Sequence, residues 1–334
     1  MEPRKRKIRV KLIARGQNSY PWRKQLPNDS DSWGDCQFIF DRNTPDYDYL
    51  VVIDDVSRKL MSPPETLACA DENTLLVTTE PPTITRYGNR FCSQFHWVLT
   101  THPKEILRHP NHIFSHTGNL WFNGHSHTEL VGTSEMHKSD AISTVCSSKS
   151  QRHTLHAERL QFTEWLCQQL PDLKRYGHGF QLLKNKYTAL DPFCFHLAIE
   201  NFIGAHHWTE KFSDPILSHC VPIYYGCPNM DDYFPTEAYL KIDIHQRELA
   251  LSQIRELISD PSNYQKRLPA VLEAKQLVLN DYNLMKMIHD HVCETFDSSN
   301  KASQRRLYGR KQIRLVNPVD CLSHCKWFIN RIFN

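Results

Sequence analysis

Short apolar runs alternate along the chain with polar loops and with segments of helical periodicity. Continuous apolar runs closed by polar residues or by proline are typical of strands buried on both faces of a parallel sheet. In the first half they predict strands at residues 8–14, 37–40, 49–53, 74–78 and 97–100. A short helix is predicted between residues 86 and 95. Strands alternating with short helices indicate a Rossmann-like α/β domain.

The second half shows the same alternation and then becomes mostly helical. Apolar residues between 151 and 170 fall near helical spacing, which predicts a helix. Further strands are expected at 141–146 and 239–244, and residues 245–296 are expected to be helices separated at Pro261. Residues 103–140 have no periodic pattern, so loops are expected there. The polar stretch 147–150 gives the best domain boundary.

The segment from Phe195 to Pro235 is the most informative part of the chain. It predicts one βαβ unit, with a strand at 195–199, a helix opening near 208–211 and a strand at 221–225. Glu200 and Asn201 directly follow the first strand. Ligands of open α/β sheets bind at the carboxyl ends of the strands. A cation, a carboxylate and an amide at one sheet edge suit a sugar nucleotide, which carries a diphosphate and hydroxyl groups.

Pro215 affects where the helix of this unit is expected to begin. A proline inside a helix removes a backbone hydrogen bond, whereas Ser213-Asp214-Pro215 suits a helix start. On this interpretation the helix begins near Ser213, and Glu210 and Lys211 lie in the preceding loop.

Composition limits the class of protein. The chain has 334 residues, enough for one large or two ordinary domains, and its apolar content of 40% supports a real core. No apolar run approaches the ~20 residues needed to span a bilayer. The basic N-terminus lacks a signal-peptide core, which makes the cytoplasm the expected compartment. Eleven scattered cysteines are then expected to be mostly buried thiols.

Charge is uneven although the net charge is only +3. Residues 301–334 carry eight basic side chains and one acid, Asp320, and are therefore about +7. Apolar residues from Leu322 onward fit an amphipathic helix, including Trp327 and Phe328. Two alternatives stay open: this tail lies on an anionic membrane surface, at the inner face of the membrane, or it packs on the first domain. The body shows no basic field that would match a nucleic acid.

Three motifs of the βαβ unit carry a resemblance to a known family. Ile199-Glu200-Asn201, Trp208-Thr209-Glu210-Lys211 and Pro222-Ile223-Tyr224-Tyr225-Gly226 together resemble the α1,3/4-fucosyltransferases, glycosyltransferase family 10. The strong match spans about forty residues. The resemblance implies a GT-B-like α/β fold, with two Rossmann-like domains facing a central cleft. Residues 1–150 would form the acceptor-side domain, residues 151–300 the GDP-sugar donor-binding domain and residues 301–334 a basic tail.

The resemblance also implies a set of donor-binding residues. Lys211 would contact the diphosphate, which a cation beside helix N-terminal amides favours. Arg159 would pair with phosphate oxygens, with Arg152 as its alternative. Glu210 and Glu200 would accept hydrogen bonds from hydroxyl groups, although Glu200 is equally suited to bond loop amides beneath the site. Trp208 replaces the tyrosine usual in the family. The full implied set is Arg159, Glu200, Asn201, Trp208, Thr209, Glu210, Lys211, Tyr225 and Gly226.

Glycosyl transfer also needs a base that takes the proton of the acceptor hydroxyl. Glu80 follows the predicted strand 74–78 and precedes two prolines, which places it at the carboxyl end of that strand. This arrangement resembles that of the family, which makes Glu80 the candidate catalytic base. Asp54 and Asp55, after the strand 49–53, are the alternatives.

Metal ligands are not expected. Asp46-Tyr47-Asp48 is a D-x-D triplet, which holds a metal in other glycosyltransferases, but its place before a strand indicates a turn. The histidines at 102, 112, 116, 125 and 127 lack cysteine or acidic partners at regular spacing, and Cys321 and Cys325 lack further ligands. No cofactor is expected, and Lys211 and Arg159 would replace a metal cation.

These observations predict an inverting glycosyltransferase. It would move fucose or a related sugar from a GDP-sugar to a glycan acceptor that is lipid-linked, a polysaccharide or a glycoprotein, giving an α-linkage. The alternatives are a related glycosyltransferase with another nucleotide sugar, which Trp208 favours, and a non-catalytic protein that binds GDP-sugars or glycans.

Overall fold

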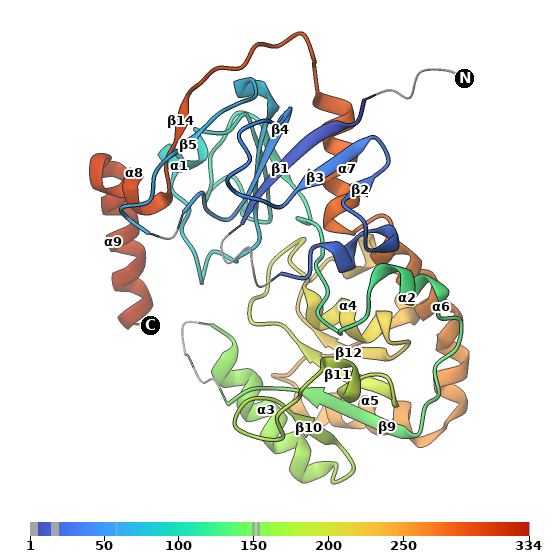
Figure 1. Cartoon of the computed structure of the whole chain (residues 1–334). Coiled ribbons are helices and arrows are strands. Elements are labelled where there is room, and N and C mark those ends of the chain that lie inside the picture. Colours follow the sequence, from blue (N-terminus) through green and yellow to red (C-terminus); the bar gives the residue numbers. More distant parts are fainter. Residues whose placement is uncertain (1–5, 15–19, 58, 149–150, 152–153, 334) are drawn as a thin grey trace, which may run out of the picture. The chain divides into compact units, whose positions relative to one another are not determined.

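The computed structural model describes residues 6–14, 20–57, 59–148, 151 and 154–333, without the side chains of 332 and 333. The chain forms two compact units (Figure 1). The first unit consists of Met1–Gly118 and Leu284–Asn334, and the second of Asn119–Asn283. Each is an α/β unit with its own sheet.

A seven-stranded sheet organises the first unit. Its strands are parallel except for the antiparallel edge strand β2. Their order is β2 (Ser32–Trp33), β3 (Cys36–Ile39), β1 (Ile8–Ala14), β4 (Tyr49–Ile53), β6 (Thr74–Thr78), β7 (Trp97–Thr100) and β8 (His112–Phe114). The five strands predicted from apolar runs are confirmed to within one residue, because burial on both faces makes such runs continuous.

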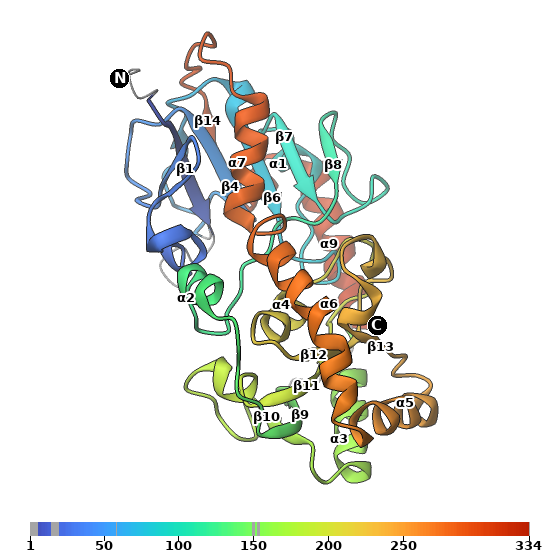
Figure 2. The same ribbon diagram turned by 90° about the vertical axis from the view of Figure 1, so that its right-hand side faces the viewer.

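Helices cover both sides of this sheet. In Figure 1, α7 (Leu284–Thr295) lies on one side, and α8 (Arg310–Val316) and α9 (Pro318–Phe333) lie on the other; in Figure 2, α7 runs in front of the strands. The short helix α1 (Asn89–Cys92) contacts α8 and α9. β5 (Glu65–Thr66) and β14 (Arg306–Leu307) form a separate antiparallel pair. Leu50, Leu76 and Val98 from the sheet share one core cluster with Phe91 and Ile313.

The second unit is a doubly wound parallel sheet. Its strand order is β10 (Lys174–Tyr176), β9 (Asp140–Val145), β11 (Phe193–Ile199), β12 (Val221–Tyr225) and β13 (Leu240–Lys241). Numbered along the chain, this is the order 2-1-3-4-5, in which the direction of winding reverses between the first and third strands. The main helices of the unit are α3 (His156–Gln169), α4 (Glu210–Leu217), α5 (Arg247–Ser259) and α6 (Ser262–Leu279). α3 packs against α5, and α4 packs against α6.

The α/β class with two Rossmann-like units is confirmed. The structure, however, divides the chain at other positions than the sequence predicts. β9 pairs with β10 and β11, so residues 119–148 belong to the second unit and not to a domain ending at residue 150. α7 belongs to the first unit, so the second ends at Asn283 rather than near residue 300. Strand pairing and helix packing are long-range, which a polar stretch such as 147–150 does not report. Residues 149 and 150 lie outside the described residues.

Three shorter elements also differ from the sequence predictions. Residues 103–140, expected to be loops, contain β8 and the helix α2 (His127–Gly132). A capping box starts α2, because the Ser126 side chain accepts from Glu129 N and the Glu129 carboxylate accepts from Ser126 N. The strand predicted at 239–244 and the helix predicted at 86–95 are limited to Leu240–Lys241 and Asn89–Cys92.

The C-terminal tail is part of the first unit. Arg310 Nε bonds Asp55 Oδ2 at 2.9 Å, and both side chains are buried. The Asp320 carboxylate accepts from Arg90 N and Phe91 N, and Trp327 Nε1 donates to Pro82 O at 2.8 Å. The structure therefore has the packed alternative, although Leu315, Val316, Val319 and Leu322 remain 68–78% exposed. Within the described residues, no helix has the length and apolar character required to cross a membrane.

The buried Arg310–Asp55 pair gives a test of this packing. Arg310→Ala should lower the free energy of unfolding by about 3–5 kcal/mol, because it leaves Asp55 buried without its cation. Urea unfolding followed by circular dichroism measures this. Arg306→Ala is the matched control, because Arg306 is an exposed arginine of the same tail and should change stability by less than about 0.5 kcal/mol. Equal effects of the two substitutions would contradict a stabilising role of the pair.

Candidate functional site

A pocket of about 280 Å³ lies at the carboxyl edge of the second unit's sheet. It is lined by residues 144–147, at the end of β9, and by residues 196–199 at the end of β11 together with Asn201. These two strands flank the point where the winding reverses, which is where open α/β sheets bind ligands. Of the described residues, the cations that line it are Arg159, Lys186 and Lys211, and the only carboxylate is that of Glu210. The structure thus brings together Arg159, Asn201, Glu210 and Lys211.

Glu200 connects the end of β11 to the start of α4. Its side chain is 1% exposed and accepts hydrogen bonds from Thr209 N at 2.9 Å and from Thr209 Oγ1. Thr209 is the N-cap of α4, since its Oγ1 also accepts from Lys211 N at 3.3 Å. Glu200 is not among the described residues that line the pocket. It bonds the loop before α4, which agrees with the alternative in which Glu200 bonds loop amides.

The threonine cap corrects the predicted helix start. α4 begins at Glu210, so Glu210 and Lys211 occupy its first turn and not a loop before Ser213. Pro215 lies inside the helix, which is only eight residues long. The loss of one backbone hydrogen bond there is outweighed by the cap and by burial of Phe212 and Ile216.

Lys211 is held between two carboxylates. Its Nζ lies 3.0 Å from Glu210 Oε1 and 3.5 Å from Glu200 Oε2. Burial alone would lower the pKa of Lys211, but Glu210 and Glu200 outweigh it and raise that pKa. Burial likewise opposes ionisation of Glu210, yet Lys211 and Lys186 hold its pKa at about 2. For Glu200 burial prevails over the attraction of Lys211 and raises the pKa. Lys211 is therefore a fixed cation.

Arg159 lies near the start of α3 and is 6% exposed. Its Nη1 donates to Asn201 Oδ1 at 2.7 Å, so an amide two residues beyond β11 orients the guanidinium group. Its Nε is buried and has no hydrogen-bond partner among the described residues. A buried, unpaired guanidinium nitrogen is costly, so it indicates a place for an acceptor such as a phosphate oxygen. Arg152, its sequence alternative, lies outside the described residues.

The structure adds pocket residues that the sequence did not indicate. Lys186, in the 3-10 turn Lys186–Ala189, bonds the buried Asp214 at 2.7 Å, and His156 and His178 also line the pocket. Nothing in the spacing of these residues points to a site, because they come from three separate segments. Gly177 has a φ of +131°, and a Cβ there would lie 2.7 Å from Cys146 O, so this wall requires glycine.

Trp208, Tyr225 and Gly226, which the resemblance implies as donor-binding residues, pack against other parts of the second unit. Trp208 is 2% exposed and packs in an aromatic cluster with Phe212 and Phe234. Tyr225 ends β12 and meets His245 edge to face. At Gly226 a Cβ would lie 2.3 Å from the Tyr224 hydroxyl, so this glycine allows the strand end to pack closely. None of the three is among the described residues that line the pocket.

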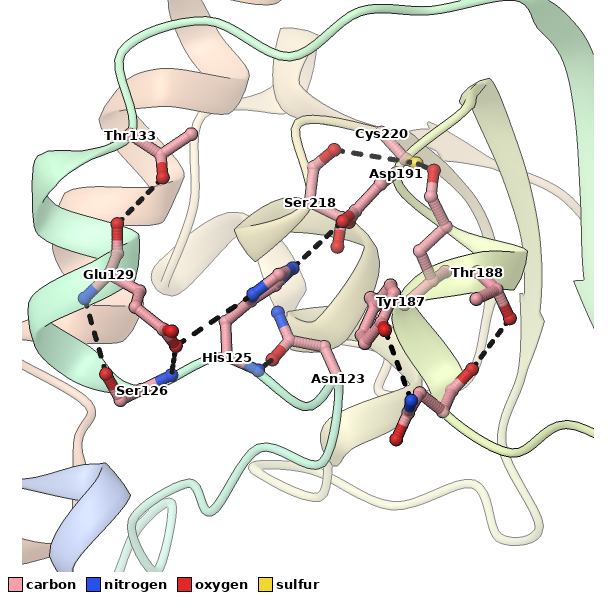
Figure 3. Close-up of polar contacts among 12 residues, drawn as sticks. Asn123, His125, Ser126, Glu129, Thr133, Tyr187, Thr188, Asp191, Ser218 and Cys220 are labelled. Atoms are coloured by element: carbon pink, nitrogen blue, oxygen red, sulfur yellow. Dashed lines mark hydrogen bonds and ion pairs between the residues drawn. The ribbon is translucent and has the colours of Figure 1, made fainter.

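Three of the candidate metal-binding residues, His125, Asp46 and Asp48, are engaged in other contacts. His125 Nε2 bonds Asp191 Oδ2 at 2.9 Å, and its Nδ1 lies 4.0 Å from Glu129 Oε2, which ties the loop to α2 (Figure 3). Asp46 pairs with Arg9, and Asp48 accepts from Arg9 N at 2.8 Å. In the described part of the chain, no three His, Cys, Asp or Glu side chains gather so that they could hold a metal ion.

Glu80 lies in the first unit, two residues beyond β6, and is half-buried. Its main chain is fixed, because its N–H donates to the Tyr87 hydroxyl at 3.3 Å and its carbonyl oxygen bonds His102 Nε2 at 2.9 Å. The alternatives are buried and bonded: Asp54 accepts from Thr79 N at 2.8 Å, and Asp55 holds Arg310.

A protein-family model covers the part of the chain that contains this pocket. The model of "Glycosyltransferase family 10 (fucosyltransferase) C-term" matches residues 136–313, which is more than half of the chain and includes every pocket residue described above. The chain belongs to glycosyltransferase family 10. The family indicated by the three motifs of the βαβ unit is thereby confirmed.

Individual relatives match over shorter segments. Human GDP-fucose protein O-fucosyltransferase 3 is 40% identical over 82 residues, 24% of this chain and 17% of that protein. The rat protein of the same name is 32% identical over 180 residues, 47% of this chain and 36% of that protein. The Alpha-(1,3)-fucosyltransferase FucT of Helicobacter pylori is 31% identical over 83 residues, 25% of this chain and 17% of that protein. The chain thus matches only a minor part of the length of these curated relatives.

Among solved structures, an α1,3-fucosyltransferase with GDP-fucose is similar over 85% of this chain and 94% of that chain. Its sequence identity is 16% and the TM-score is 0.48.

The Lys211 pairings predict a pH-dependent loss of stability. Lys211→Met leaves Glu200 and Glu210 without their shared cation and should lower the free energy of unfolding at pH 8 by about 3 kcal/mol. Because the Glu200 pKa is then raised further above its unfolded value, the folded variant takes up protons more readily than the unfolded chain. The loss should therefore be smaller at pH 5 than at pH 8. Urea unfolding at both pH values measures this.

Lys184→Met is the matched control, because Lys184 is an exposed lysine two residues before Lys186. It should leave stability nearly unchanged at both pH values. A loss for Lys211→Met that is the same at pH 5 and pH 8 would exclude buried carboxylates as its cause.

Proposed function

We propose that the protein transfers fucose from GDP-fucose to an acceptor hydroxyl. The observation that carries the proposal is the buried Arg159 Nε, which lacks a partner among the described residues in a pocket where Lys186 and Lys211 supply two further cations. A diphosphate fits this donor set, because arginine pairs with two phosphate oxygens and lysine supplies a point charge. Membership of family 10 and the fucosyltransferase relatives support fucose as the sugar.

In this reaction the pocket would stabilise the leaving group, GDP. When the bond to the anomeric carbon breaks, negative charge grows on the diphosphate, and preorganised cations stabilise it. Arg159 and Lys211 would supply that stabilisation, helped by the first amides of α4. The reaction would then need no divalent metal. Glu210 keeps Lys211 oriented and can accept a hydrogen bond from a donor hydroxyl.

Glu80 would be the general base on the acceptor hydroxyl. It lies two residues beyond the carboxyl end of β6 and is half-buried. Asp54 and Asp55 are buried, and they bond Thr79 and Arg310 within the unit. The acceptor oxygen would attack the anomeric carbon on the face opposite the departing GDP. Inversion of the β-linked donor would give an α-linked product.

The acceptor has two candidates. The family as a whole suggests a glycan hydroxyl. The relatives named GDP-fucose protein O-fucosyltransferase 3 favour a hydroxyl of a protein side chain as the second candidate. Contact with an anionic membrane surface is a further proposal, supported by the exposed Leu315, Val319 and Leu322 beside the basic residues of the tail.

The donor assignment predicts selective stabilisation by nucleotides. GDP should raise the melting temperature in the presence of EDTA, and UDP should raise it far less; at ~100-fold excess over Kd the gain is about 2.7 kcal/mol. Arg159→Gln should remove most of the shift, since it removes a charged, bidentate donor. Arg255→Gln is the matched control, because Arg255 is an exposed arginine of the same unit. Equal shifts from UDP and GDP, or a shift abolished by EDTA, would argue against this donor site.

The base assignment predicts a separation of binding from turnover. Glu80→Gln keeps the shape of the side chain and removes the proton acceptor, so GDP binding should stay within a few fold while transfer falls by about 10²–10⁴. Transfer from radiolabelled GDP-fucose to a pool of glycans and proteins measures this. Glu72→Gln is the control, because Glu72 is exposed at the opposite end of β6 and should transfer normally. Normal transfer by Glu80→Gln would move the role to another group, and GDP binding by wild type without any transfer would favour a non-catalytic protein.

A further inference from the structure

A second pocket, of about 320 Å³, lies in the first unit and is strongly basic. Its cations are Arg86, Lys311, Arg314 and Arg331, together with the Arg310 side chain that is bonded to Asp55. Asp55 is the single carboxylate among the described lining residues, and Arg310 neutralises it. Four further cationic side chains therefore share this pocket, and its described lining residues include no second carboxylate.

Several contacts fix the walls of this basic pocket. Trp327 Nε1 donates to Pro82 O, which holds α9 against the loop after β6. Arg314 Nη2 donates to Arg86 O at 2.7 Å. The Arg331 guanidinium lies 5.4 Å from the centre of the Trp327 ring, a cation–π contact. The guanidinium groups of Arg314 and Arg331 are thus positioned before any ligand arrives, which reduces the entropy lost on binding.

The cations also repel one another. Burial lowers the pKa of Arg314, and the neighbouring Arg310 lowers it further. Burial lowers the pKa of His324, which also lines the pocket, and Arg314 and Arg310 add to that effect. An anion in the pocket would relieve this repulsion.

The basic pocket belongs to the same sheet edge as Glu80. It is lined by Asp55, after β4, and by residues 84–86, which follow Glu80 in the loop after β6. The Arg310 guanidinium lies 5.0 Å from the centre of the Tyr87 ring, and the Tyr87 hydroxyl accepts from Glu80 N. Arg310 and the buried Tyr87 therefore connect this pocket to the main chain of Glu80.

We propose that the basic pocket binds a phosphate or sulfate ester carried by an acceptor saccharide. Arginine side chains pair with the oxygens of such esters, and several unpaired cations favour a group of higher charge than a single carboxylate. A pocket of about 320 Å³ suits one sugar ring with its ester, since small-ligand sites begin near ~300 Å³. The role as an acceptor subsite rests on the proposed function, whereas the binding of the ester does not.

Titration of the full chain with glucose 6-phosphate and with glucose tests the binding step. The indole N–H signal of Trp327, assigned with Trp327→Phe, reports the pocket in ¹⁵N NMR spectra. We expect glucose 6-phosphate to shift this signal and glucose to have no effect at the same concentration. Affinity should fall with added salt, since the attraction is between charges. Equal responses to the two sugars would overturn the proposal.

The double variant Arg86→Gln/Lys311→Gln should weaken glucose 6-phosphate binding at least about tenfold, because it removes two charge-assisted contacts. Arg306→Gln, an exposed arginine outside the pocket lining, should bind normally. Both variants should keep the GDP-induced rise in melting temperature, which also shows that they are folded. Unchanged binding of the phosphate ester by the double variant would overturn the assignment to this pocket.

Two further probes separate the sources of the same chemistry. A phosphoserine peptide that binds more tightly than glucose 6-phosphate would overturn the saccharide assignment in favour of a protein. A response of Trp327 to vesicles containing phosphatidylserine, but not to glucose 6-phosphate, would overturn it in favour of a membrane headgroup. If the ester binds and no fucosyl transfer occurs, only the proposed function fails; if transfer occurs and the ester does not bind, only the pocket assignment fails.

Discussion

The buried carboxylate of Glu200 is the constraint on which the donor pocket depends. A carboxylate with 1% exposure is costly unless cations and hydrogen-bond donors surround it. Here Thr209 supplies a main-chain and a hydroxyl donor, and Lys211 supplies the charge. Satisfying Glu200 therefore fixes the N-terminus of α4 against the end of β11. The same contacts place Lys211 and the first amides of α4 beside the pocket.

This arrangement gives the motif residues unequal roles. Glu200, Thr209 and Gly226 build the platform, while Lys211 and Glu210 line the space above it. Arg159 comes from α3, and its guanidinium group donates to Asn201. The Asn201 amide therefore connects α3 to the end of β11. A substitution in this platform would thus weaken donor binding by displacing Lys211 and Glu210. A substitution of Arg159 would act through charge, which is why the two classes need different experiments.

The sequence predicted most of what local pattern controls. Apolar runs located five strands of the first unit, and the position of polar residues after β11 indicated the sheet edge that carries the donor pocket. The local pattern does not predict pairing and packing between distant segments. The assignment of β9 to the second unit depends on its register with β11, and Lys186 reaches the pocket through Asp214, 28 positions away. The predicted start of α4 is wrong because the Thr209 cap, and not Pro215, determines where the helix begins.

The tail shows why an amphipathic pattern alone leaves its partner open. Its basic and apolar residues fit either a membrane surface or a protein core, and the decisive contacts are single polar ones. Arg310 bonds Asp55 across 255 positions, and Asp320 caps α1 through Arg90 N and Phe91 N. In these contacts Arg310 and Asp320 hold the tail against the first unit. They leave Lys311, Arg314 and Arg331 gathered beside a neutralised carboxylate, so the packing that makes the tail structural also creates the basic pocket.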